Sequence, residues 1–313
     1  MSFDADAITD RRRLKRRLFF WRFGAVVAVL LAVFAVFGAS GFHRAQIARV
    51  EINGIITDDR DLQDLLKQLG DDTAIKAVIL SIDSPGGTTT GAEALYTSVR
   101  RLAAKKPVVA TLGTVAASGG YIAALSADHI VARGNTLTGS IGVLFEWPQF
   151  TGLMEKLGIE MKAVKSAPLK AEPAPYHKAT PEALAATNDL VVSSYDWFLG
   201  LVQERRKLDA ATARKLGDGR VYTGWQAVGN KLVDEIGGDD EAVAWLAKAR
   251  GIPARLPVRD WAPIRPDEGY GFFGARAAGE VLAGGIEALA GKTLQTKRLT
   301  LDGLTSVWHP DAR

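Results

Sequence analysis

The feature that most constrains the fold is a regular alternation of strand-like and helix-like segments that begins at Ala48. The apolar strand-like runs are residues 48–56, 74–82, 107–112 and 129–132, and the helix-like segments between them are residues 59–69, 88–104 and 116–125. Such an alternation predicts an α/β fold with a mainly parallel sheet and helices packed on it. Binding and active sites in such sheets gather at the carboxyl ends of the strands.

A second feature is an uncharged apolar run of 20 residues, Phe23–Phe42, which directly follows a basic segment, residues 1–22. A helix of this length spans about 30 Å, the thickness of the hydrocarbon layer of a membrane. The basic segment has seven Lys and Arg against three Asp, which predicts that this end stays in the cytoplasm. We therefore expect a single transmembrane anchor over 23–42, with the rest of the chain on the other side of the membrane.

Two alternatives to the anchor are a buried core helix and a cleaved signal peptide. Residues 39–41, Ala-Ser-Gly, are small enough for processing by a signal peptidase. The apolar run is longer than the roughly 7–15 residues of a signal-peptide core, which favours an uncleaved anchor.

Charge and cysteine content exclude two other classes of function. The net charge of +4 is carried by residues 1–22, and the remaining chain has equal numbers of basic and acidic residues. A balanced chain has no overall attraction to phosphate backbones, so we expect no nucleic-acid partner. The chain has no cysteine, which excludes disulfides and thiol chemistry.

The candidate nucleophile is Ser118, which lies between small residues in the segment 116–120, AASGG. A serine hydroxyl becomes a good nucleophile only when a base takes its proton. The N–H groups at the start of a helix would stabilise the negative charge that develops. The glycines of Ser84–Gly87 could supply further amides to an oxyanion. The structural alternatives are a helix N-cap at Ser118 and a plain turn at 84–87.

The base could be a histidine or a lysine. The chain has four histidines, at positions 43, 129, 177 and 309. Only His177 is a plausible member of a Ser-His-Asp triad, and a surface or core role is more typical of such a residue. A lysine can replace histidine when desolvation lowers its pKa from about 10.4. Lys165 and Lys170 flank a locally apolar stretch, and a carboxylate at Glu172 close to Lys170 would oppose base function.

Five short motifs occur in order along the chain: DSPGG at 83–87, AASGGY at 116–121, LTGSIG at 137–142, KS at 165–166 followed by Lys170, and DGRVYTG at 218–224. Together they resemble the signal peptide peptidase A family, membrane-bound serine peptidases with a Ser/Lys dyad. The resemblance covers residues 49–238, and it implies a nucleophile at Ser118 and a general base at Lys170, with Lys165 in reserve. It further implies that Ser140 orients the lysine.

The resemblance also implies an oxyanion hole formed by the backbone amides of Gly86 and Gly119. The implied fold is the crotonase/Clp-protease-like ββα superhelix, preceded by the anchor. The expected domains are a cytoplasmic segment 1–22, the anchor 23–42, a peptidase domain 43–250 and an extension 251–313 of unknown role.

For function, the resemblance implies a homo-oligomer in the bacterial inner membrane that degrades remnant signal peptides and other apolar peptides on the periplasmic side. Neither a metal nor a cofactor is expected. Two other functions stay open: an acyl-CoA hydratase or isomerase of the crotonase type, and a non-catalytic membrane scaffold with the same fold.

Overall fold

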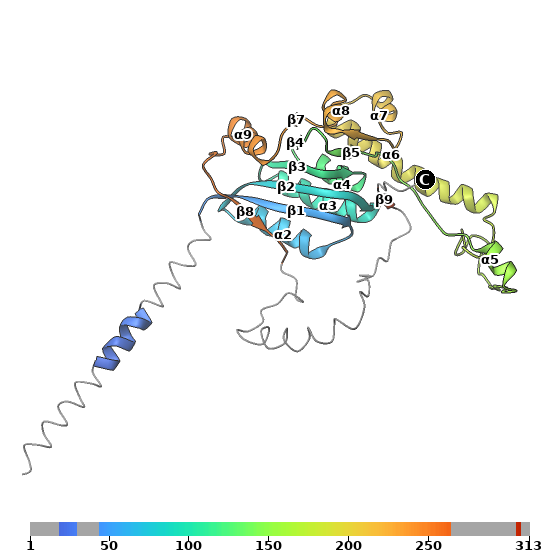
Figure 1. Cartoon of the computed structure of the whole chain (residues 1–313), viewed down its shortest axis with the longest axis horizontal. Coiled ribbons are helices and arrows are strands. Elements are labelled where there is room, and N and C mark those ends of the chain that lie inside the picture. Colours follow the sequence, from blue (N-terminus) through green and yellow to red (C-terminus); the bar gives the residue numbers. More distant parts are fainter. Residues whose placement is uncertain (1–18, 30–43, 264–304, 308–313) are drawn as a thin grey trace, which may run out of the picture. The chain divides into compact units, whose positions relative to one another are not determined.

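The computed structural model describes residues 19–29, 44–263 and 305–307 (Figure 1). The chain divides into two compact units, Met1–Gln46 and Ile47–Arg313. In the first unit, residues 19–29 are helical. None of the helices in the described ranges is long and apolar enough to cross a membrane. Residues 30–42 of the expected anchor, and residues 1–18 before it, lie outside the described residues.

The second unit is organised around one sheet, which has nine strands within the described residues. The main path runs in the order β6-β5-β3-β2-β1-β8, with β4 and β9 pairing to β3 and β2, and β7 pairing to β4. The strands are β1 Gln46–Ile56, β2 Ile75–Thr88, β3 Val108–Ala117, β4 His129–Ala132, β5 Leu137–Gly139, β6 Val221–Thr223, β7 Glu235–Ile236, β8 Val258–Trp261 and β9 Thr305–Val307. The pairs β2–β3, β3–β4, β3–β5, β4–β7 and β1–β8 are parallel. The predicted α/β class with a mainly parallel sheet is therefore confirmed.

Helices cover both faces of this sheet (Figure 1). They are α2 Arg60–Asp71, α3 Thr89–Ala103, α4 Gly119–Leu125, α5 Thr151–Lys156, α6 Pro181–Arg206, α7 Ala210–Leu216, α8 Gly224–Gly229 and α9 Asp239–Arg250. Side chains alternate between the two faces of β2: Val78 and Leu80 enter the larger core, whereas Ala77 and Ile79 pack in the core that also contains Leu246 of α9. This two-residue period is the signature of a strand buried on both sides.

Polar side chains cap the first turns of three of the helices. Asp59 Oδ1 accepts a hydrogen bond from the amide of Leu62 at 3.0 Å, and Thr88 Oγ1 accepts one from Gly91 at 3.0 Å. Thr180 caps α6, whose first residue is Pro181. Each side chain satisfies an amide that lacks a partner inside its helix.

Two predicted boundaries are wrong, and both lie where strands end. The strand expected over 74–82 continues to Thr88, so the segment 84–87, for which a plain turn was the structural alternative, belongs to β2. The helix expected from residue 116 begins at Gly119, because Ala116 and Ala117 stay in β3. The reason is that β2 and β3 keep pairing with each other. Their register shifts between Ile82 and Ser84, and Ser84 of β2 then lies opposite Ala116 of β3. Both strands therefore reach further than their apolar runs.

Two strands come from beyond residue 250. β8 pairs in parallel with β1, placing Val258 opposite Ile47, and β9 pairs with β2. On the side of the unit opposite β8, α5 lies away from the sheet next to the N-terminal end of α6 (Figure 1). We call residues 143–180 the arm. Its two halves are joined by a hydrogen bond of 2.7 Å from the amide of Phe150 to the carbonyl of Pro175.

Candidate active site

Ser118 occupies the junction between β3 and α4. Its φ of 55° is positive, which is uncommon for a residue with a side chain, and only 1% of the residue is exposed. Its amide donates to the carbonyl of Gly139 at 2.8 Å, and its carbonyl accepts from Tyr121 and Ile122. Within this fully described segment the Ser118 side chain makes no capping hydrogen bond to α4. Ser118 is thus the N-cap residue of α4 by position, but its side chain does not cap the helix. Strained backbone of this kind is concentrated at functional sites.

The end of β2 packs directly against this junction. A Cβ atom at position 120 would lie 2.6 Å from the backbone oxygen of Ser84, so only glycine allows this approach. Ser84 itself is fully buried. The two Gly-rich segments singled out in the sequence thus meet at the carboxyl edge of the sheet.

Replacing Gly120 by alanine is expected to destabilise the protein by about 1–3 kcal/mol, because α4 and the Ser84 backbone of β2 must move apart to admit a methyl group. The measurement is urea unfolding followed by circular dichroism. Gly200→Ala is the matched control: position 200 lies inside α6, where a Cβ would have no neighbouring atom within 4 Å, so alanine should raise stability by about 0.5–1 kcal/mol. Equal stability of Gly120→Ala and the unchanged protein would contradict the close approach.

The amide of Gly86 already has a hydrogen-bond acceptor. Gly86 has a φ of 116°, a conformation that favours glycine, and its N–H donates to Ser84 Oγ at 3.1 Å. If the Gly86 N–H binds an oxyanion, it must either also keep its hydrogen bond to Ser84 Oγ or break it. Gly119, the other expected donor, is buried at the first position of α4. Sequence reasoning missed the Ser84 hydroxyl, for which the turn-like pattern SPGG offered no signal.

Ser140 lies beside Ser118 on the neighbouring strand. β3 and β5 run in parallel with Ala117 opposite Gly139, and each serine follows directly after its strand. Ser140 also has a positive φ, of 48°, and is 9% exposed; its amide donates to the carbonyl of Arg220 at 2.9 Å. The structure therefore brings together Ser118 and Ser140 at one edge. The strand β5, only three residues long, was too short to be found from its pattern.

The lysines lie in the arm. Lys165 forms an ion pair with Glu172, and His177 Nε2 lies 3.1 Å from the same carboxylate oxygen. The Lys165 ammonium, with His177 beside it, holds the pKa of Glu172 below its usual range. Glu172 thus opposes base function at Lys165, and not at Lys170 as the sequence suggested. Lys170 is exposed, and its ammonium makes no hydrogen bond or ion pair with any residue in the described ranges.

The Ser118–Lys170 hydrogen bond that a dyad requires is consequently not formed within this single chain. The two histidines in the described part of the chain do not take the place of Lys170 as the base. His177 is engaged with Glu172, and His129 is held by Glu235 at 2.8 Å and stacks on Trp245. His43 and His309 lie outside the described residues. In the described ranges, no group of three or more His, Asp or Glu side chains could hold a metal ion.

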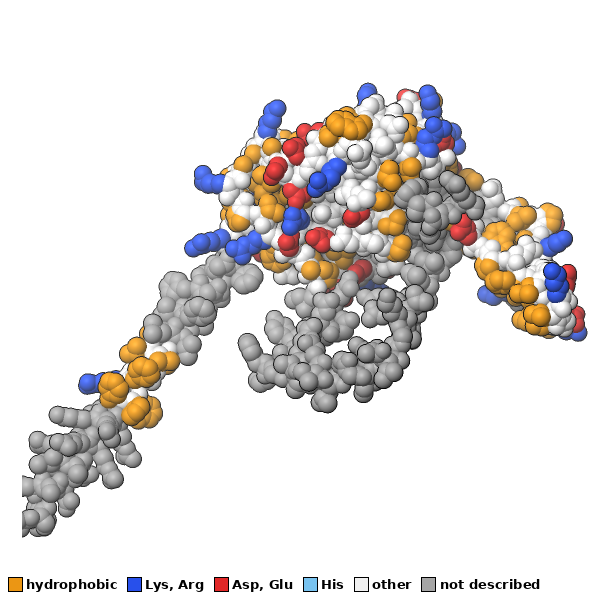
Figure 2. Space-filling model, viewed as in Figure 1, with side chains coloured by type: hydrophobic (Ala, Val, Ile, Leu, Met, Phe, Trp, Pro, Cys, Tyr) orange, Lys and Arg blue, Asp and Glu red, His pale blue; other side chains and the backbone are white. Residues whose placement is uncertain are grey.

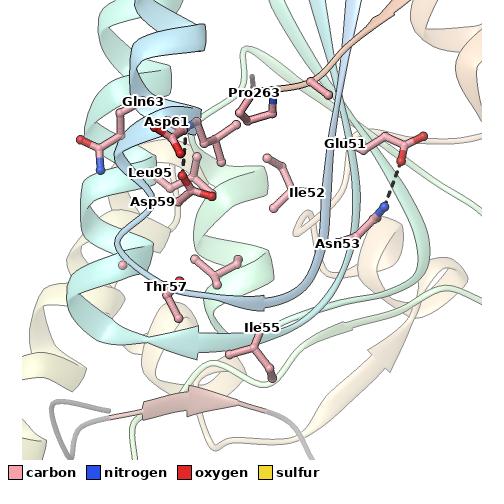
Figure 3. Close-up of a pocket in the computed structure, with 14 residues that line it drawn as sticks. Glu51, Ile52, Asn53, Ile55, Thr57, Asp59, Asp61, Gln63, Leu95 and Pro263 are labelled. Carbon is pink, nitrogen blue, oxygen red and sulfur yellow. Dashed lines mark hydrogen bonds between the residues drawn. The ribbon is translucent and has the colours of Figure 1, made fainter. Parts of the chain in front are cut away.

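A cavity of about 660 Å³ opens next to the end of β1 (Figure 3). Its labelled residues include apolar Ile52, Ile55 and Leu95 as well as the carboxylates Asp59 and Asp61. No sequence pattern indicated this cavity, because its lining comes from β1, α2, α3 and residues 262–263 together.

Comparison with known proteins identifies the family. Residues 100–253 match Peptidase family S49. A "Putative protease" of Synechocystis sp. is 35% identical over 211 residues, which are 67% of this chain and 76% of that protein. A "Putative signal peptide peptidase SppA" of Enterococcus faecium is 33% identical over 228 residues, 68% of this chain and 66% of that protein. Among solved structures, a mutant form of a "1510-N membrane-bound stomatin-specific protease" has a TM-score of 0.47 and 18% identity, covering 71% of this chain and 99% of its own.

The family match decides between the functions that the sequence left open. It favours a serine peptidase over an acyl-CoA hydratase or isomerase and over a non-catalytic scaffold. The strained, buried serine at a strand–helix junction is consistent with that chemistry. The chain belongs to peptidase family S49, the signal peptide peptidase A family, and is a serine peptidase.

Proposed function

We propose that the chain is a membrane-anchored endopeptidase that cleaves remnant signal peptides and other apolar peptides with a dyad of Ser118 and Lys170. The observation that carries the proposal is the position of Ser118. It is strained and buried, it lies next to Gly119 and to the strand that leads to Ser140, and the end of β2 packs against its junction through Ser84. The proposal includes the crotonase/Clp-protease-like superhelix as the finer description of the α/β fold.

The proposed reaction is acyl transfer to serine followed by hydrolysis. Lys170 Nζ takes the Ser118 proton, and Oγ attacks the carbonyl carbon of the scissile peptide bond. The amides of Gly86 and Gly119 donate to the oxyanion of the tetrahedral intermediate. The lysine returns its proton to the leaving amine as the C–N bond breaks. A water molecule, deprotonated by the same lysine, then releases the acyl group from Ser118.

The dyad requires a movement or a partner. Lys170 is exposed on an arm that also exposes several large apolar side chains among its charged ones, and Figure 2 shows hydrophobic side chains on this part of the molecule. Leu153, Leu157 and Leu169 are 57%, 62% and 47% exposed. Such a surface is typical of an interface between proteins. We infer a homo-oligomer in which burial of the arm desolvates Lys170 and brings it to a Ser118 hydroxyl.

The sequence supports the proposed anchor and location of the enzyme. The uncharged run Phe23–Phe42 behind seven basic residues favours an N-terminus in the cytoplasm and a peptidase on the periplasmic side of the inner membrane. The relative from Enterococcus faecium is named as a signal peptide peptidase, and cleaved signal peptides are apolar segments released at that membrane. These are the substrates that we assign to this chain.

The pH profile of kcat/KM tests the lysine base. Activity on an apolar reporter peptide is expected to rise by at least about tenfold from pH 6 to pH 9, because protonation converts the lysine into an ammonium that cannot accept the Ser118 proton. Glu172 does not contribute to this change: its pKa is held below its usual range by Lys165, so it stays ionised throughout. A flat profile between about pH 6 and pH 9 would exclude the dyad.

A further inference from the structure

Glu172 is a nearly buried carboxylate in the arm, and the proposed reaction does not use it. Its side chain is 6% exposed. One oxygen, Oε1, contacts Lys165 Nζ and lies 3.1 Å from His177 Nε2. The other oxygen, Oε2, is buried and makes no hydrogen bond with any residue in the described ranges. A buried carboxylate oxygen without a donor lowers stability, so stability alone does not explain why this carboxylate lies here.

The two contacts of Glu172 close the segment that carries Lys170. We call residues 165–177 the lysine loop. Lys165 begins this loop and His177 ends it, and both side chains reach the same carboxylate oxygen. The Lys165 side chain is only 21% exposed, so salt and water screen this ion pair less than they screen a surface pair. Glu172 therefore joins the two ends of the lysine loop from inside it.

Between these contacts the backbone of the lysine loop bends in two overlapping turns. The amide of Lys170 donates to the carbonyl of Ala167 at 3.1 Å. The amide of Glu172 donates to the carbonyl of Leu169 at 3.3 Å. Ala171 has a φ of 60°, a conformation that persists in a residue with a side chain only when the surrounding contacts enforce it. As a result Lys170 is exposed, whereas Glu172 is nearly buried.

Lys165 also limits the effect of the Glu172 charge on the base. A free carboxylate beside a lysine stabilises the ammonium form of that lysine and opposes its action as a base. The Lys165 ammonium compensates the carboxylate charge directly. Glu172 can therefore hold the lysine loop without keeping Lys170 protonated.

We propose that Glu172 is a positioning residue for Lys170. Its contacts with Lys165 and His177 hold the lysine loop in one conformation. Lys170 then meets Ser118 on a backbone that is already fixed. The proposal rests on the proposed function, in which Lys170 is the base. A base on a preformed support loses little conformational freedom in the reaction, whereas a displacement of about 1 Å can lower the rate about 100-fold.

Glu172→Gln in the full-length protein tests this role. Glutamine keeps the size of the side chain but has no charge to hold Lys165. We expect kcat for an apolar peptide to fall about 10- to 100-fold, with KM within about twofold of the parent because substrate binding is unchanged. Glu160→Gln is the matched control and should keep full activity, since Glu160 is an arm carboxylate that pairs with Lys162 at 3.1 Å but is 75% exposed.

The rates are measured at the alkaline plateau of the pH profile, where the base is unprotonated in every variant, and are divided by the folded fraction from circular dichroism. An unchanged kcat in Glu172→Gln would overturn the proposal. The same measurement in the Lys170→Ala background separates positioning of the base from a general effect on the structure. If Glu172 acts only through Lys170, Glu172→Gln should lower the residual kcat/KM of Lys170→Ala by less than about twofold.

Equal loss in both backgrounds would overturn the positioning role and assign Glu172 a merely structural one. Failure of the proposed function gives a different result, because Lys170→Ala would then keep full activity by itself. A loss in Glu172→Gln alongside a fully active Lys170→Ala would therefore contradict both the dyad and a role of Glu172 through Lys170.

His177→Ala is a second variant for the case that Glu172→Gln does not fold. It removes one of the two contacts of Glu172 and leaves the ion pair with Lys165 in place. The His177 side chain is 39% exposed, so its loss is expected to spare the fold. We expect kcat to fall about three- to tenfold in the parent and to stay unchanged in the Lys170→Ala background. Equal loss in the two backgrounds, or no loss in either, would again overturn the proposal.

Discussion

Ser118→Ala is expected to lower kcat/KM for cleavage of an apolar peptide by about a thousandfold or more, because no acyl-enzyme can form without Oγ. What activity is left would come from the oxyanion donors and substrate binding alone. The same variant is expected to lose labelling by a serine-directed fluorophosphonate. Both are measured on the full-length protein, with initial rates for cleavage and in-gel fluorescence for labelling.

The loss should be chemical and not structural. Alanine retains the Cβ atom, so the strain of the positive φ at position 118 is the same in both proteins. Ser193→Ala is the matched control, since Ser193 is an exposed serine in α6, and it should retain full activity and labelling. If Ser118→Ala kept more than about a tenth of the activity at an unchanged Tm, Ser118 would not be the nucleophile.

Most of the fold could be predicted because each helix and strand has a local sequence pattern of apolar spacing or capping residues. The buried strand over 75–82 alternates between two cores, and helices such as α2 and α3 begin at capping residues, Asp59 and Thr88. The errors arose where tertiary pairing extends a strand beyond its apolar run. Ser84–Gly87 has the composition of a turn, but its pairing with β3 and β9 keeps it extended.

The sequence could predict only those site residues that lie in short, recognisable motifs. Ser118 and Ser140 lie side by side because β3 and β5 are neighbours, an arrangement that two motifs in the right order indicated. The pairing of Glu172 with Lys165, and not with Lys170, depends on how the arm folds back on itself. No spacing rule distinguishes two lysines five residues apart in an irregular loop, so the choice of base required the resemblance.

Lys170→Ala is expected to lower kcat/KM by about 100- to 10,000-fold, the usual contribution of a general base. Lys165→Ala should retain activity within about tenfold of the parent, because Lys165 is already committed to an ion pair with Glu172. Its effect should be on stability: the variant removes the ammonium that pairs with a nearly buried Glu172 carboxylate and leaves it the His177 ring and the Ala174 amide, so Tm should fall. Activity and Tm measured on the same two variants therefore separate a base from a positioning residue.

Lys170→Arg distinguishes base chemistry from a simple need for positive charge. Arginine keeps the charge and much of the length of lysine but stays protonated in proteins, so it cannot take the Ser118 proton. We expect Lys170→Arg to be as inactive as Lys170→Ala, whereas a purely electrostatic role would be largely preserved. If Lys165→Ala were inactive and Lys170→Ala active, the base would be Lys165. The enzyme would then have to break the ion pair with Glu172 in each active site before Ser118 could react.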